Sequence, residues 1–169
     1  GLLREDREKK VWEIGIPMGV IAAIVPSTNP TSTVCYKALI ALKSGNAIVF
    51  SPHPKAIRAT LAAAKIVSAA AEAAGAPKGS VNCLTIPSLQ GCQELMTAPE
   101  VRLILATGGP GMVKAAYSSG KPAIGVGAGN GPAYIHRSAD VKQAISHILR
   151  SKTFDNGTVC ASEQSIIVE

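Results

Sequence analysis

The sequence predicts an α/β fold, an open parallel sheet with helices on both faces. Three observations support this prediction. Short apolar runs alternate with longer segments of helical composition, which is the order of elements in a parallel sheet. The runs are apolar throughout rather than alternating with polar residues, which is typical of strands buried on both faces. Many of the 16 glycines and 11 prolines fall between these segments and favour short connections.

The first unit of this pattern begins with the apolar run 19–25, which predicts a buried strand that ends at Pro26. Asn29 is suited to cap a helix, and Pro30 suits the first helical position. We therefore expect a helix over residues 30–43, closed by a glycine two residues later.

The same alternation continues along the rest of the chain. We expect strands at 47–50, 81–86, 101–106, 123–126 and 132–136, helices at 55–74, 88–97, 112–117 and 140–152, and a last extended segment from Gln164. No low-complexity linker interrupts this order. A length of 169 residues with 47% hydrophobic content is enough for one domain with its own core.

The charge pattern argues against nucleic acid as a partner, although the net charge is +6. The one dense basic cluster, residues 4–10, is interleaved with acidic residues, so we interpret it as a solvated segment that neutralises itself. Two Phe, three Tyr and one Trp are too few to stack along a single strand of nucleic acid. Because no run reaches the length of a membrane helix, we expect no membrane association.

Four cysteines are present, without a C-x-x-C pair or a histidine at zinc spacing, so we expect no metal site. No secretory signal is visible at the start, which favours a reducing, cytoplasmic location. Cys35, Cys83 and Cys92 lie in apolar or helical stretches and are interpreted as small buried residues. Cys160 is different because it follows a polar loop that contains glycine.

Ligands of open α/β sheets bind at the carboxyl ends of the strands, and three such ends are unusual here. They are residues 27–29, residues 107–109 and the glycine-rich loop 125–131. A glycine turn before a helix lets backbone N–H groups approach a pyrophosphate. The strict G-x-G-x-x-G spacing is absent, because Lys114 stands where the third glycine is required. From the residues alone, nucleotide binding and the tight turns of a generic α/β protein both remain open.

A cysteine at a turn can act as a nucleophile, and an inert Cys160 at a loop end also remains open.

These segments, in their order and spacing, resemble the aldehyde dehydrogenase superfamily over essentially the whole chain. The matching segments are 26–30, 107–109, 118–123, 125–130 and 151–164. The resemblance is strongest to the CoA-acylating branch, which includes the aldehyde dehydrogenase half of bifunctional aldehyde-alcohol dehydrogenases. It implies a Rossmann-like NAD-binding domain at 1–163, truncated at its N-terminus, and the first strand of a missing catalytic domain at 164–169.

The resemblance also implies roles for individual residues. Cys160 would attack the aldehyde, and the Asn29 side-chain amide with the Cys160 backbone N–H would hold the resulting oxyanion. Hydride would then pass to NAD and leave a thioester on Cys160. The residues implied to bind NAD are Pro26, Ser27, Thr28, Ser51, His53, Thr107, Gly108, Gly109, Val126 and Gly127.

Two departures from the hydrolytic branch of the superfamily shape the expected reaction. Hydrolytic relatives carry in the glycine-rich loop a glutamate that activates water, whereas residues 125–131 contain no carboxylate. This favours transfer of the acyl group to the thiol of CoA. Hydrolytic relatives also use a lysine and a glutamate after the second strand to hold the adenosine ribose. Residues 51–54 are Ser-Pro-His-Pro here, so Ser51 or His53 would have to substitute.

We therefore expect an enzyme that reversibly converts a short-chain aldehyde, CoA and NAD to acyl-CoA and NADH. The expected full-length protein is a cytoplasmic homo-oligomer, with a bacterial microcompartment as one setting. Two alternatives stay open: a catalytically inert nucleotide-binding or assembly module, and an acyl-phosphate reductase of the same superfamily.

Overall fold

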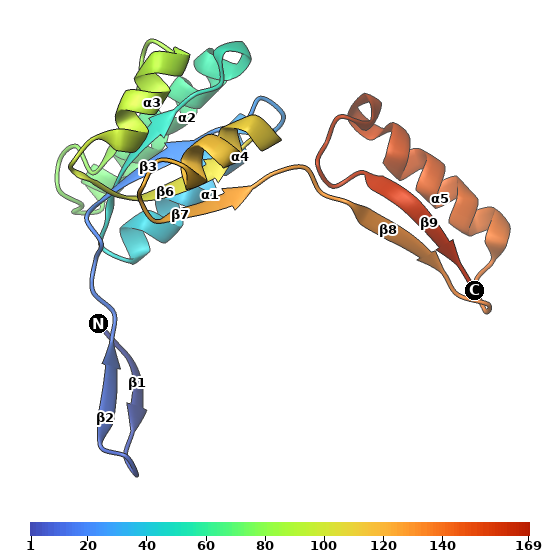
Figure 1. Ribbon diagram of the computed structural model, residues 1–169, viewed down its shortest axis with the longest axis horizontal. Helices are drawn as coiled ribbons and strands as arrows, with labels where there is room; N and C mark the ends of the chain where they lie inside the picture. The colour runs from blue at the N-terminus through green and yellow to red at the C-terminus, as the bar shows by residue number, and fades with distance from the viewer. The chain divides into compact units, whose positions relative to one another are not determined.

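A computed structural model describes all 169 residues of the chain (Figure 1). The chain forms two compact units, Gly1–Val126 and Gly127–Glu169. The first unit contains, in order, β1 (Leu2–Asp6), β2 (Val11–Ile14), β3 (Val20–Ile24), α1 (Pro30–Lys43), β4 (Ala47–Ser51), a 3₁₀ turn η1 (Pro54–Ala56), α2 (Ile57–Ala73), β5 (Val81–Cys83), α3 (Leu89–Thr97), β6 (Val101–Thr107), α4 (Pro110–Tyr117) and β7 (Ala123–Val126). The second contains β8 (Gly131–Ile135), α5 (Val141–Thr153), a 3₁₀ turn η2 (Phe154–Gly157) and β9 (Glu163–Val168).

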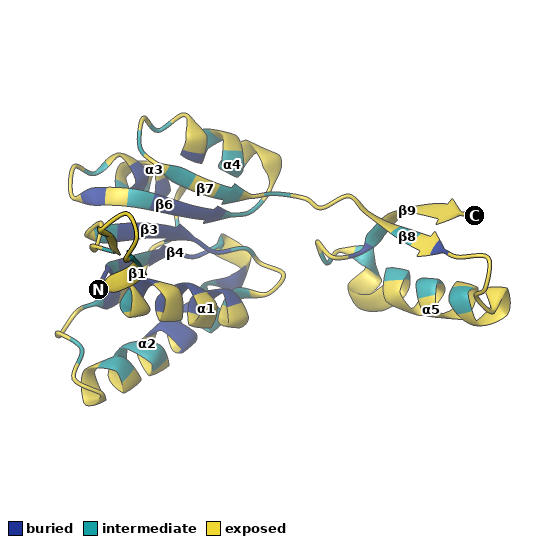
Figure 2. Cartoon of the chain, turned by 90° about the horizontal axis from the view of Figure 1, so that it is seen from below, coloured by how far each residue is buried: buried dark blue, intermediate teal, exposed yellow.

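The first unit is built on a five-stranded sheet in the order β5-β4-β3-β6-β7, and every neighbouring pair is parallel. Figure 2 shows α1 and α2 on one side of this sheet and α3 and α4 on the other. The predicted α/β fold with helices on both faces is confirmed. One predicted strand is shorter than expected, because residues 81–86 pair with β4 only over Val81–Cys83.

The central strand β3 supplies both hydrophobic cores of the first unit. Ile21 and Ala23 pack into the core beneath α1 and α2, whereas Ala22 and Ile24 pack into the core beneath α3 and α4. All four side chains are at most 5% exposed. This alternation explains why the run is apolar at every position, since a strand covered on both faces has no solvent side.

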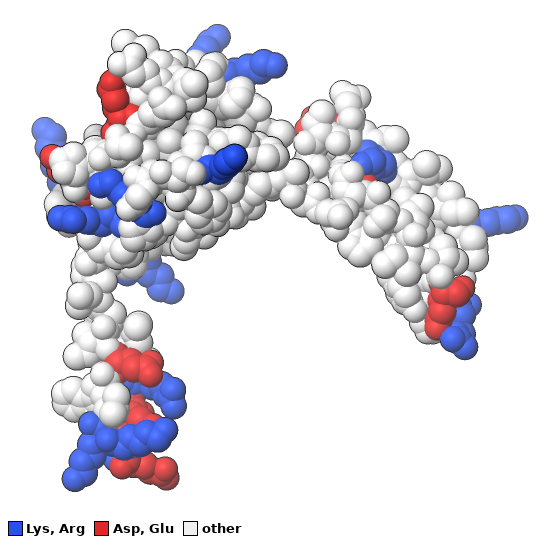
Figure 3. Space-filling view, in the orientation of Figure 1, with Lys and Arg blue, Asp and Glu red and all other residues white.

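The N-terminal segment, expected to be merely solvated, forms an antiparallel hairpin of β1 and β2. Its turn places Lys10 in the left-handed region at φ 54°, a conformation that glycine or asparagine usually signals. The expected neutralisation of charge is confirmed, because Arg4 pairs with Asp6 and Glu13, and Arg7 pairs with Glu5. Figure 3 shows basic and acidic side chains mixed along this hairpin.

In the second unit, β8 and β9 form a parallel pair against which α5 packs. β9 begins at Glu163, one residue before the expected extended segment. The two compact units divide inside the glycine-rich loop, after Val126. The assignment of 1–163 to one domain and of 164–169 to a separate catalytic domain stays a prediction.

The cysteines differ in exposure, and one expectation is wrong. Cys92 is buried and Cys83 is half-buried, but Cys35 is exposed on α1. The reason is helical periodicity, since α1 buries Val34, Ala38 and Ala41, and Cys35 lies off that stripe. No helix in the structure combines the length and the hydropathy of a membrane-spanning segment.

Candidate functional site

The carboxyl ends of four parallel strands lie at one edge of the sheet in the first unit. Ile24 of β3 pairs with Ser51 of β4 and with Ala106 of β6, and Thr107 pairs with Val126 of β7. The helix after β3 and the helix after β6 cover opposite faces of the sheet, so the gap between these two strands is a topological switch point. Nine of the ten residues expected to bind the cofactor are on the segments that leave this edge: Pro26, Ser27, Thr28, Ser51, His53, Thr107, Gly108, Gly109 and Val126. Gly127 is the first residue of the second unit.

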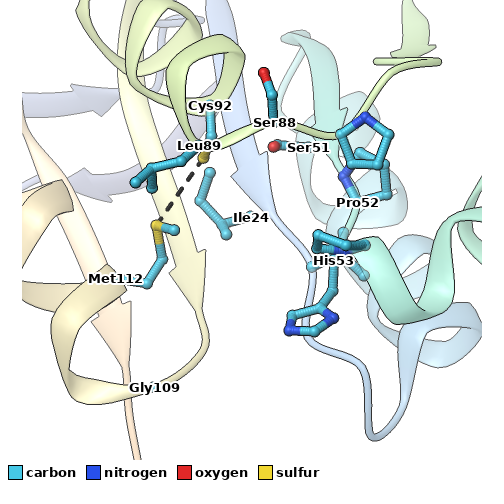
Figure 4. Close-up of a pocket in the computed structure, with 12 residues that line it drawn as sticks. Ile24, Ser51, Pro52, His53, Ser88, Leu89, Cys92, Gly109 and Met112 are labelled. Carbon is cyan, nitrogen blue, oxygen red and sulfur yellow. Dashed lines mark hydrogen bonds between the residues drawn. The ribbon is translucent and has the colours of Figure 1, made fainter.

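A pocket of about 280 Å³ opens beside this edge, between the end of β4 and the first turns of α3 and α4 (Figure 4). We call it the β4-end pocket. Ser51, His53 and Gly109 of the expected cofactor residues line it. The other lining residues were not foreseen from the sequence: Ile24, Val25, Pro52, Pro54, Pro87, Ser88, Leu89, Cys92 and Met112. In Figure 4, Cys92 and Met112 lie on one side of the pocket and Pro52 and His53 on the other.

The His53 ring has a defined orientation and tautomer. Its Nδ1 accepts a hydrogen bond from the backbone N–H of Lys55 at 3.1 Å, so the side chain caps the short turn η1. Because a ring nitrogen that accepts carries no proton, the proton of the neutral ring is on Nε2. His53 therefore presents Nε2–H as a free donor.

One further group at the strand ends suits a polar ligand. The Thr107 hydroxyl at the end of β6 is buried and has no hydrogen-bond partner, which is a cost that a bound ligand can relieve. The start of α4 offers less, because Pro110 has no N–H and the N–H groups of Met112 and Val113 already donate to the Gly109 carbonyl oxygen.

A buried lysine, missed from the sequence, joins the two strands at the switch point. Lys37 of α1 is 1% exposed, and its Nζ donates to the carbonyl oxygens of Ile24 and Leu105, both at 2.8 Å. Burial lowers the pKa of Lys37 to about 7. In the sequence, nothing distinguishes it from a lysine on the solvent face of a helix.

Asn29 occupies the cap position of α1, but its side chain does not cap the helix. The helix start is held instead by the Asn29 carbonyl oxygen, which accepts from the backbone N–H and the hydroxyl of Thr33. The Asn29 Oδ1 accepts from the Thr28 hydroxyl at 3.2 Å, and its Nδ2 makes no hydrogen bond. The amide therefore remains available as a donor, so the cap position and a second role are compatible.

Cys160 lies in the second unit, exposed on a turn in which the Ser162 N–H donates to the Val159 carbonyl. The glycine-rich loop reaches this turn, because a Cβ atom on Gly129 would lie 2.8 Å from the Cys160 carbonyl oxygen. That distance leaves no room for any side chain at residue 129. Asn29 belongs to the first unit and Cys160 to the second.

Polar contacts hold the segments on both sides of Cys160. Before it, the Thr158 hydroxyl donates to Asp155, whose φ of 51° is in the left-handed region. After it, the Ser151 hydroxyl of α5 donates to Glu163 Oε1 at 2.8 Å, and this bond lowers the pKa of the Glu163 carboxyl. No group of three or more His, Cys, Asp or Glu side chains is placed to hold a metal ion.

Comparisons with known proteins agree on one family. The family model "Aldehyde dehydrogenase family" matches residues 3–169. The bifunctional aldehyde-alcohol dehydrogenase AdhE of Escherichia coli is 59% identical over 99% of this chain, which spans 19% of that relative. An acetylating aldehyde dehydrogenase from Geobacillus thermoglucosidasius is 60% identical, with a TM-score of 0.92 over 100% of this chain and 37% of that one. A Rhodopseudomonas palustris propionaldehyde dehydrogenase with bound propionyl-CoA is 41% identical, with a TM-score of 0.83 over 90% of this chain and 34% of that one.

The chain thus spans about a fifth of the length of its curated bifunctional relative and more than a third of the solved acetylating enzyme. The family match covers nearly every residue, including the three strand-end segments and the Cys160 turn. The chain belongs to the aldehyde dehydrogenase family.

Proposed function

We propose that this chain is the cofactor-binding and nucleophile-bearing part of an enzyme that converts a short-chain aldehyde, NAD⁺ and CoA to acyl-CoA and NADH. The names of its relatives support the acyl-transfer reaction, since one is an acetylating aldehyde dehydrogenase and another was solved with propionyl-CoA. The proposed setting is a cytoplasmic homo-oligomer.

The observation that carries the proposal is the contact between Gly129 and Cys160. The glycine-rich loop lies against the backbone of the nucleophile, yet residues 125–131 contain no carboxylate that could activate water. Of the two carboxylates near the turn, Asp155 accepts from Thr158, and Glu163 accepts from Ser151 through Oε1 while its Oε2 is buried without a partner. The glycine-rich loop therefore supplies no base for hydrolysis of a thioester on Cys160, and a thiol, which ionises more readily than water, is the better acceptor.

In the proposed reaction the Cys160 thiolate attacks the aldehyde carbon and forms a thiohemiacetal. The Asn29 amide and the Cys160 backbone N–H donate to its oxyanion, and loss of one such donor typically costs about 2.7–4 kcal/mol of barrier. When bound, NAD⁺ would accept the hydride that the thiohemiacetal carbon loses, which leaves the acyl group on Cys160 as a thioester. The sulfur of CoA then adds to the thioester carbonyl, and the Cys160 thiolate leaves as acyl-CoA forms.

The residues proposed to hold NAD are those at the strand ends. Ser51, His53 and Gly109 line the β4-end pocket, and Pro26, Ser27, Thr28, Thr107, Gly108, Val126 and Gly127 lie on the neighbouring strand-end segments. The unpartnered Thr107 hydroxyl supports a polar ligand at the switch point.

The test measures NADH formation by the full-length protein that carries this chain, with CoA, with inorganic phosphate and with neither. We expect NADH formation to depend on CoA and to disappear in Cys160→Ser, while Cys35→Ser keeps the wild-type rate. Full-rate NADH formation without CoA, with release of the free acid, would contradict the proposal. Dependence on phosphate rather than CoA would identify an acyl-phosphate reductase.

A further inference from the structure

Glu163 connects the segment after Cys160 to the helix before it. Glu163 is the first residue of β9, and its backbone pairs with Gly131 at the end of the glycine-rich loop. Its side chain reaches α5, which lies alongside β9 (Figure 1), and its Oε1 accepts from the Ser151 hydroxyl at 2.8 Å. The two residues are 12 positions apart, so this hydrogen bond closes a loop that contains Cys160.

The loop needs such a contact because part of its backbone is unfavourable. Asp155, Asn156 and Gly157 lie one after another in the left-handed region, at φ of 51°, 52° and 69°. For residues other than glycine this conformation costs about 1–2 kcal/mol each, so it persists only where surrounding contacts fix it. The Thr158 hydroxyl, which donates to Asp155, fixes this stretch from within, and the Glu163 side chain closes the loop around it.

The surroundings of the Glu163 carboxylate favour holding the loop over transferring a proton. Oε2 is buried and has no hydrogen-bond partner, so the bond from Ser151 is the one hydrogen bond that the carboxylate accepts from another side chain. A hydroxyl that donates to a carboxylate makes one of the stronger hydrogen bonds in proteins. The same bond lowers the pKa of the Glu163 carboxyl, and a carboxylate with a low pKa is a weak base near neutral pH.

We propose that Glu163 is a positioning residue that, through Ser151, holds the Cys160 turn in the conformation in which its thiolate attacks the aldehyde. This inference rests on the proposed function, which makes Cys160 the nucleophile. In this role Glu163 touches neither the aldehyde nor a cofactor. Without the bond, α5 and β9 no longer close the loop through side chains, and Cys160 spends less time in the reactive geometry.

The experiment measures kcat and the KM for CoA of NADH formation by the full-length protein. Ser151→Ala and Glu163→Ala are each expected to lower kcat by about tenfold, because a displaced nucleophile reacts slowly, and to leave the KM for CoA unchanged. Glu163→Gln keeps an oxygen that can accept from Ser151, so it is expected to restore most of the lost kcat. Ser146→Ala, on the same helix, is the matched control and is expected to keep the wild-type kcat.

A double-mutant cycle tests whether the two residues act as a unit. If Glu163 acts through Ser151, the variant with both alanines is no slower than either single variant. Three results would each overturn the inference: losses that multiply in the double variant, a wild-type kcat in both alanine variants, or a Glu163→Gln variant as slow as Glu163→Ala.

Two further measurements keep the test decisive. Urea unfolding shows whether each variant folds, and if Glu163→Ala does not, the comparison of Ser151→Ala with Ser146→Ala decides, with equal kcat values overturning the inference. Alkylation of the wild-type protein by iodoacetamide tests the proposed function separately. A Cys160 that reacts no faster than Cys35 there would count against the proposed nucleophile rather than against the role of Glu163.

Discussion

The Cys160 carbonyl oxygen lies 2.8 Å from the position that a Cβ atom of residue 129 would occupy, so the backbone of the Cys160 turn packs directly against Gly129. Real Cβ atoms essentially never approach a backbone atom so closely. The atom in the way is the backbone carbonyl oxygen of Cys160 rather than the end of a flexible side chain. It can move aside only if the Cys160 turn itself moves. The glycine at this position therefore fixes where Cys160 stands relative to the loop.

Gly129→Ala is expected to displace the Cys160 turn and to lower CoA-dependent turnover by tenfold or more, since small misplacements of reacting groups are costly. Gly131→Ala is the matched control, because a Cβ atom there meets nothing within 4 Å and the backbone φ is ordinary. The measurement is kcat/KM of both variants in the full-length protein. Equal values for the two variants would show that the contact has no influence on the nucleophile.

Asn29→Ala is expected to lower kcat by about 10²–10³-fold, the usual effect of losing one oxyanion donor. Its stability should change little, because the side chain makes a single hydrogen bond, from Thr28, and does not cap α1. Asn46→Ala provides the contrast. Asn46 is buried and accepts from the N–H groups of Met18 and Gly19, so its loss should cost about 1–3 kcal/mol of stability.

For both asparagine variants, urea unfolding measures the free energy of unfolding and steady-state kinetics measures kcat. Together they distinguish an effect on catalysis from an effect on stability. A large loss of stability in Asn29→Ala, with normal turnover per folded molecule, would mean that the residue acts as a structural cap after all.

Local signals account for what the sequence predicted well. The α1 helix matches its expected bounds of 30–43, because Asn29 and Pro30 mark its start and Gly45 follows its end. The strand ends that carry the expected cofactor residues follow from the same alternation. The N-terminal hairpin was missed because its turn uses Lys10 with positive φ instead of glycine, which leaves no signal in the residue types.

Long-range packing accounts for what the sequence did not reveal. Leu89, Cys92 and Met112 line the β4-end pocket only because α3 and α4 begin beside the end of β4. Lys37 reaches two strand carbonyls that are 13 and 68 residues away along the chain. No spacing rule connects such residues before the sheet order is known.

Thiol labelling should distinguish the four cysteines by their rates of alkylation. In this chain Cys160 and Cys35 are exposed, whereas burial raises the pKa of Cys83 to about 11 and also raises that of Cys92. Since the thiolate is the reactive form, iodoacetamide should modify Cys160 and Cys35 first and the other two only after unfolding. A nucleophilic Cys160 should react faster than Cys35, as followed by mass spectrometry of the digested protein. Equal rates for these two thiols would favour the inert module.

Lys37 should make the stability of the protein rise with pH. Burial lowers its pKa from 10.5 to about 7, so between these values the unfolded chain binds more protons than the folded one. Stability therefore increases with pH across this window, by up to about 1.4 kcal/mol per pH unit for one proton. Cys83 acts in the opposite direction above pH 9, because its raised pKa makes the folded state bind more protons there. The measurement is therefore confined to the range between pH 7 and pH 9.

Lys37→Met isolates this contribution, because it keeps the length of the side chain and removes the titrating amine. The variant also leaves the carbonyl oxygens of Ile24 and Leu105 without the ammonium that joins them, so its absolute stability will differ from that of the wild type. The slope of the unfolding free energy against pH is the informative quantity. Urea unfolding should give a positive slope for the wild type and a clearly smaller one for Lys37→Met. Parallel slopes would mean that Lys37 stays fully charged in the folded protein, with the two carbonyl hydrogen bonds compensating for its burial.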